Sequence, residues 1–165
     1  MSNKLKFLFF SILVLVGFFA CKDPWDEHGK INENVSTDNL FELIKKTPEL
    51  SVFAGYLSSS GWGDKIATSK TYTVWAPNND AMALVDDAIL GDSAKLQLFV
   101  SNHICFTLYS YYNNQTSDKI KSLSGKTILP DYINGKINDA DLSEPFDIVA
   151  KNGILHIIDK ALVPK

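Results

Sequence analysis

The side chains that could carry out chemistry are few and scattered in this sequence. It contains three histidines, His28, His103 and His156, and no two of them stand at the spacing of a metal-ligand pair. Asp86 and Asp87 are adjacent, so on a helix their carboxylates point in different directions and indicate a solvated face. There is no GxSxG nucleophile motif, no phosphate-binding glycine loop and no dinucleotide fingerprint. We therefore predict no catalytic residue, no metal site and no cofactor.

Cys105 lies between Ile104 and Phe106, a context typical of a small core residue. A catalytic thiol would need a basic partner to lower its pKa, and His103 would share its side only if this segment were a strand. We predict that Cys105 is a buried, unreactive residue.

Three tyrosines, Tyr109, Tyr111 and Tyr112, end the aromatic segment 105–112, which we expect to be a strand. In a strand, Tyr109 and Tyr111 share one face and Tyr112 takes the other. A rigid ring with a solvated hydroxyl suits a binding surface, so these tyrosines are ligand-binding candidates. The alternative is that the fold needs an apolar strand here and the tyrosines only keep their hydroxyls in water.

The strand nearest the centre of the predicted fold is residues 72–75, which are β-branched or aromatic. Pro77 ends this strand, and Asn78 or Asn79 can cap a following helix. Apolar residues at helical spacing predict further helices. Pro48 is expected to divide the helical stretch of residues 40–57 into two helices. These helices are expected over residues 40–57, 80–90 and 94–103.

Short strands alternate with turns in the last third of the chain. Asn134-Gly135 and Asn152-Gly153 are the strongest hairpin signals, because both residue types tolerate positive φ. The expected strands are residues 126–133, 136–139, 147–150 and 154–162.

Residues 1–20 are predicted to be a secretory leader. Lys4 and Lys6 precede an apolar run that is shorter than the roughly 20 residues needed to span a bilayer. The run ends in Ala20-Cys21, which resembles a bacterial lipobox and implies cleavage before Cys21 and lipidation of that cysteine. Residues 21–35 are polar and predict a tether between the membrane and one domain, residues 36–165.

The formal charge of −3 and the lack of a basic stripe argue against nucleic acid as a partner. Lys22-Asp23 resembles the signal that sends some lipoproteins to the outer face of the outer membrane; a plain charged tether is the alternative. The predicted location is therefore the outer membrane, at the cell surface or on the periplasmic face.

Two segments resemble the signature boxes of the fasciclin domain family. Residues 71–82, TYTVWAPNNDAM, resemble the first box, and residues 152–164, NGILHIIDKALVP, resemble the closing box. The resemblance implies an α+β fold: a β-wedge or small sandwich with helices packed on one side.

The same resemblance adds three ligand-binding candidates. Asn102-His103 stands where adhesive animal members have a Tyr-His motif, with the histidine kept and the tyrosine lost. Residues 144–148, EPFDI, stand where such members have an integrin-binding Glu-Pro-Asp-Ile peptide, which singles out Asp147 and Ile148. The alternatives are that His103 is a packed structural residue and that Asp147 marks a plain loop-to-strand junction.

We predict a non-enzymatic lipoprotein, anchored in the membrane through its lipid, that mediates adhesion or binds an extracellular protein or glycan. The alternative is an accessory glycan-binding lipoprotein of an outer-membrane uptake system. That alternative requires Trp62, Tyr109, Tyr111 and Tyr112 to form one flat exposed platform.

Overall fold

The centre of the fold is a pair of parallel strands from opposite ends of the domain. The computed structural model describes residues 36–112 and 119–163. In it, β1 (Tyr72–Pro77) pairs in parallel with β8 (Gly153–Ile158). Every residue of both strands is buried, so this part of the sheet is covered on both faces. The two signature segments thus meet side by side.

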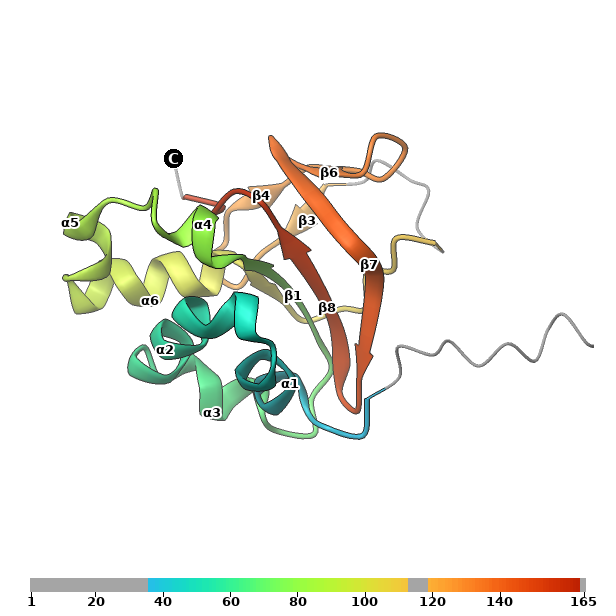
Figure 1. Ribbon diagram of the computed structural model, residues 1–165, viewed down its shortest axis with the longest axis horizontal. Coiled ribbons are helices and arrows are strands. Elements are labelled where there is room, and N and C mark those ends of the chain that lie inside the picture. The colour runs from blue at the N-terminus through green and yellow to red at the C-terminus, as the bar shows by residue number, and fades with distance from the viewer. Residues whose placement is uncertain (1–35, 113–118, 164–165) are drawn as a thin grey trace, which may run out of the picture. The chain divides into compact units, whose positions relative to one another are not determined.

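The remaining strands extend this pair into one curled sheet (Figure 1). The strand order is β2-β1-β8-β7-β6-β5, with β2 (Ile104–Cys105), β7 (Ala140–Ala150), β6 (Lys136–Ile137) and β5 (Pro130–Asp131). A second ladder joins β3 (Ile120–Lys121) to β4 (Thr127–Ile128), which continues through Leu129 into β5. Just after β3, the Leu123 amide donates to the Ile104 carbonyl at 2.8 Å. The sheet therefore curls back toward β2 as a half-barrel.

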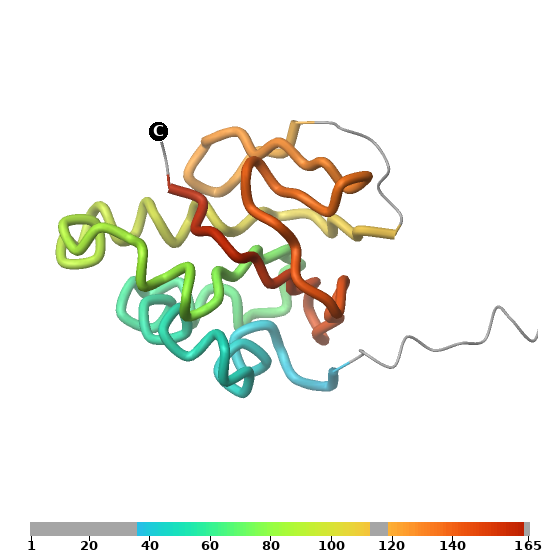
Figure 2. The backbone as a smooth tube through the Cα atoms, turned by 45° about the horizontal axis from the view of Figure 1, so that its top comes forward, coloured from blue at the N-terminus to red at the C-terminus, as the bar shows by residue number. Residues whose placement is uncertain are grey.

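The helices gather on one side of this sheet, as Figures 1 and 2 show. They are α1 (Leu40–Lys46), the 3-10 turn η1 (Pro48–Leu50), α2 (Ser51–Ser59), α3 (Trp62–Ile66), α4 (Asn79–Met82), α5 (Asp87–Leu90) and α6 (Ser93–Asn102). Asn39 caps α1 and Asn78 caps α4 through their side-chain oxygens. Within the two described segments, no helix has the length and hydropathy that a membrane span requires. The predicted α+β class with helices on one side is confirmed.

Several local predictions were wrong. The expected strand over residues 126–133 is two short strands, β4 and β5, and the strand expected at residues 147–150 begins at Ala140. The expected helix over residues 80–90 is broken, because the Asp86 carboxylate accepts from the Ala88 amide and starts α5 as a separate turn. The expected strand over residues 105–112 ends at Cys105. Beyond it the backbone makes its hydrogen bonds to side chains instead of to a neighbouring strand.

Alternate side chains of the central strands pack into two separate hydrophobic cores. Val74, Leu155 and Ile157 point into the helix-side cluster and are at most 2% exposed, as predicted for Val74 and Ile157. Trp75 and Ile158 point the other way, into the curled sheet. The period of two along each strand therefore divides the apolar side chains between the two layers.

Asn152 and Gly153 explain why the closing segment has its particular residues. The Asn152 carboxamide accepts from the Leu40 amide at 2.8 Å and donates to the Ile66 carbonyl at 2.7 Å. A Cβ on Gly153 would lie 2.1 Å from the Tyr72 carbonyl oxygen, so only glycine allows β8 to approach β1. The predicted hairpin exists, with its turn one residue earlier, at Lys151-Asn152.

Candidate functional site

The most unusual polar arrangement holds residues 107–112, which we call the crossing segment. It leaves β2 and passes three strands in turn, held by one buried side chain from each. On β1, the Thr73 hydroxyl donates to the Thr107 carbonyl at 2.6 Å and accepts from the Tyr109 amide at 2.9 Å. On β8, His156 Nε2 donates to the Tyr109 carbonyl at 2.8 Å. These side chains replace the strand ladder that the sequence predicts.

The third contact comes from a bulge in β7. Ser143 pairs with Ile157 and Ile148 with Leu155, so residues 144–147 lie opposite a single residue of β8. Asp147 turns its carboxylate inward. Its φ is 53°, a left-handed backbone conformation that Asp tolerates better than most residues. The carboxylate accepts from the Ser110 hydroxyl at 2.5 Å and from the Tyr111 amide at 2.7 Å.

Asp147, a ligand-binding candidate from the sequence, does not lie at the surface. The residue is 4% exposed and its oxygens are engaged with the crossing segment. An ionised carboxylate is buried only where donors replace water, and the amides of residues 111 and 112 with the Ser110 hydroxyl do so here. Asp147 therefore positions the binding candidates beside it.

His156 lies directly against this carboxylate. Its Nε2 is 3.6 Å from Asp147 Oδ1, and burial lowers the pKa of the imidazole. Because the Tyr109 carbonyl can only accept, Nε2 carries the proton and Nδ1 is bare, without a hydrogen-bond partner among the described residues. Both side chains are at most 5% exposed, so the pair is structural.

An aromatic ledge, formed by Tyr111, Tyr112 and Phe146, lies above the Asp147 carboxylate. The rings of Tyr111 and Phe146 stack at 4.1 Å between centroids and 20° between planes. Tyr112 stands perpendicular to Tyr111, at 5.3 Å and 89°, and is 61% exposed. Tyr132 supports Tyr111 from within, edge-on at 5.9 Å. The bulge and the crossing segment thus bring together aromatic rings that are far apart in sequence.

Sequence reasoning missed Phe146. It was treated only as the residue that interrupts a family motif. An aromatic residue beside Pro145 in a segment with no other apolar neighbour before Ile148 was the available signal.

The other predicted site residues are not at the ledge. Ile148 is half-buried against the helix-side cluster. Tyr109 packs on Trp75 with centroids 6.1 Å apart. Trp62 belongs to the helix-side cluster, with Lys65 4.2 Å above its ring. The four aromatic residues required for a flat glycan platform therefore do not form one.

His103 is a structural residue at the end of α6. Its Nδ1 donates to the Phe99 carbonyl at 2.9 Å, and its Nε2 accepts from the Leu162 amide at 2.8 Å. It is 0% exposed, and burial lowers its pKa to about 4. The imidazole joins the helix layer to the closing segment and is closed off from solvent, which favours the packed structural role over the ligand-binding one.

Cys105 is also structural. Its thiol is buried and burial raises its pKa to about 11, as expected of an unreactive core cysteine.

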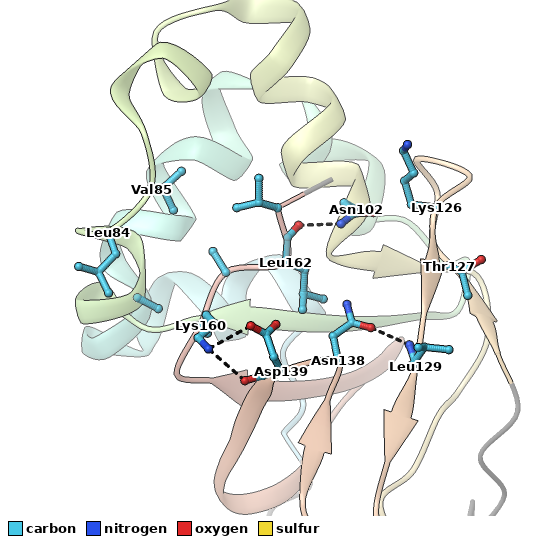
Figure 3. A pocket seen from close by; sticks show the side chains of 13 residues that line it. Leu84, Val85, Asn102, Lys126, Thr127, Leu129, Asn138, Asp139, Lys160 and Leu162 are labelled. Carbon is cyan, nitrogen blue, oxygen red and sulfur yellow. Dashed lines mark hydrogen bonds and ion pairs between the residues drawn. The ribbon is translucent and has the colours of Figure 1, made fainter. Parts of the chain in front are cut away.

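A groove of about 680 Å³ lies beyond the carboxyl ends of β1 and β8 (Figure 3). Its polar groups bond within the chain: Asn102 donates to the Leu162 carbonyl at 2.6 Å and Lys160 pairs with Asp139 at 3.1 Å. None of the predicted site residues lines it. No group of three potential metal ligands occurs in the described part of the chain. The groove therefore contains none of the residues that the sequence singles out for ligand binding.

Comparison with known proteins decides the family. The model of the fasciclin domain matches residues 48–164. The chain belongs to the fasciclin domain family. The match includes both signature segments and every residue of the ledge.

The relatives of this fasciclin domain include long proteins. Transforming growth factor-beta-induced protein ig-h3 of Sus scrofa is 25% identical over 136 residues, covering 78% of this chain and 20% of its own length. Periostin of Homo sapiens is 26% identical over 129 residues, or 74% of this chain and 15% of its own length. The chain thus spans a fifth or less of these two relatives.

A solved structure shows the same fold. It is a FAS1 domain pair from the insect cell adhesion molecule Fasciclin I, with a TM-score of 0.51 and 16% identity. The likeness covers 77% of this chain and 51% of the other.

Proposed function

We propose that this fasciclin domain is a non-enzymatic adhesion or binding module, held at the outer membrane by lipid on Cys21. The observation that carries the binding role is the aromatic ledge: Tyr112 is 61% exposed, on a backbone fixed by the buried Asp147 carboxylate. Tyrosine rings held rigidly at a surface lose little entropy when they bind a partner. An adhesion role agrees with the solved relative, which is a cell adhesion molecule.

The membrane role rests on the leader. Residues 1–35 lie outside the described part of the structure, so the signal peptide, Cys21 and the tether are argued from sequence. Two or more acyl chains on one cysteine anchor a protein stably, whereas one chain binds marginally. Cys21→Ala should therefore move the protein from the detergent phase to the aqueous phase, and a protein that stays with the membrane would refute the anchor.

The ligand-binding role is tested with Tyr112→Ser. Because Tyr112 is mostly exposed, this change should leave the melting temperature unchanged while it lowers attachment of cells that display the chain to host matrix proteins. Thr127→Ser, at an exposed position on β4, is the matched control. Undiminished attachment by Tyr112→Ser would refute the ledge as the binding surface. A glycan array run with both variants tests the accessory glycan-binding alternative.

A further inference from the structure

Three other accessible aromatic rings among the described residues have a cation above one face. On the helical side, three rings each have a lysine ammonium above them. The pairs are Lys45 over Phe41 at 4.7 Å, Lys65 over Trp62 at 4.2 Å and Lys70 over Phe106 at 5.9 Å. No ring of the ledge has such a cation among the described residues.

Two carboxylates belong to the bulge that carries Phe146. Glu144, two residues before Phe146 on the same bulge, is exposed. The Asp147 carboxylate lies beneath Tyr111 and Tyr112 and bonds to both amides. Aromatic faces are themselves electron-rich, so rings and carboxylates together attract a positive group. A neutral sugar could donate hydroxyl hydrogen bonds to the exposed Glu144 carboxylate but would gain no attraction between opposite charges.

We infer that the ledge binds a lysine or arginine side chain of a partner polypeptide, with the cation over Tyr112 and within reach of Glu144. This inference rests on the proposed function and names the chemistry of its partner. Tyr112 stands at 89° to Tyr111 and 69° to Phe146 and is 61% exposed, so its ring lies outside the stacked pair and offers a face to a cation. The partner supplies the cation that lysines 45, 65 and 70 supply elsewhere.

The test measures binding of the full chain, in detergent, to a fluorescent peptide of alternating serine and lysine. The comparison probe is the same peptide with every lysine acetylated, which removes the charge and keeps the length. The double variant Tyr112→Leu with Glu144→Gln should raise the Kd of the lysine peptide about 3- to 30-fold, since it removes one cation–π contact and one exposed ion pair. Tyr112→Phe should stay within about twofold of wild type, because it keeps the ring.

The matched control is the double variant Phe106→Leu with Glu49→Gln. Phe106 is an exposed ring that already has a lysine above it, and Glu49 is an exposed carboxylate away from the ledge in sequence. It should bind like wild type, which separates the ledge from general attraction to an acidic protein. If the ledge double variant melts lower than wild type, the single variants at Tyr112 and Glu144, each an exposed side chain, decide the result.

The inference is overturned if the acetylated peptide binds as tightly as the lysine peptide, or if the ledge and control variants weaken binding equally. If Tyr112→Ser loses matrix attachment but the ledge double variant binds the lysine peptide with the wild-type Kd, the cationic partner is refuted and the adhesion role stands. Absence of ledge dependence in both assays would refute both proposals.

Discussion

Acidification should destabilise this domain through His103. The Leu162 amide can only donate and the Phe99 carbonyl can only accept, so the two contacts require a neutral imidazole with its proton on Nδ1. A second proton on Nε2 would face the Leu162 N–H in a site with no exposure to water. This geometry explains why the folded pKa is lowered to about 4.

The magnitude follows from the difference between the folded and unfolded pKa of His103. The unfolded value is 6.5, so below that pH the unfolded chain takes up a proton that the folded chain does not. The free energy of unfolding therefore has its full value above pH 6.5 and falls as the pH approaches 4. At one pKa unit per about 1.4 kcal/mol, the loss at pH 4 is about 3 kcal/mol.

The assay is urea unfolding at several pH values between 7 and 4, for wild type and His103→Gln. The variant starts less stable at pH 7, because it cannot reproduce both buried contacts. The difference in unfolding free energy between the two proteins should shrink by about 3 kcal/mol on going to pH 4, while carboxylates and His156 contribute equally to both. A difference that is independent of pH would refute the reasoning, and NMR titration of the His103 ring measures the pKa directly.

The other predictions concern the core, the thiol and the tether. Ile157→Ala removes a side chain that is 2% exposed and should cost roughly 2–5 kcal/mol in urea unfolding; a loss under about 0.5 kcal/mol would remove Ile157 from the core. The Cys105 thiol, with a pKa of about 11, should resist alkylation at pH 8 until urea unfolds the chain, and fast labelling of the folded protein would contradict its burial. A chain that begins at Val35 should melt cooperatively near the full-length temperature, and a large drop would show that the tether packs on the domain.

The elements with strong local signals were predictable from sequence. The strand of residues 72–75, the cap at Asn78 and the break near Pro48 appear as expected, because proline geometry and side-chain capping act within a few residues. The Asn134-Gly135 hairpin joins β5 to β6, although its turn has four residues. Residues 113–116, whose polar side chains predict a turn, lie outside the described part of the chain.

The candidate site was only half predictable. Tyr111 and Tyr112 were identified from their type. Their positions depend on the bonds that Thr73, His156 and Asp147 make to the crossing segment, between residues 34 to 47 positions apart. Local propensity cannot report contacts of that range, so an aromatic segment was predicted as a strand. The Asp147 carboxylate points inward because the backbone has a positive φ at this residue. The motif match at residues 144–148 does not reveal that conformation.

The parallel pairing of β1 with β8 also sets the order in which this protein can be made. Tyr72 and its partner Gly153 are 81 positions apart, so the central strand pair cannot form until residue 153 has been synthesised. At about 5–20 residues per second, a ribosome needs roughly 4–16 s to add that intervening length. During this interval β1 has no partner at the edge where β8 will lie, and the central sheet is incomplete. A nascent chain without its central strand pair is easier to unfold for passage through a secretion channel, which suits the leader proposed for residues 1–20.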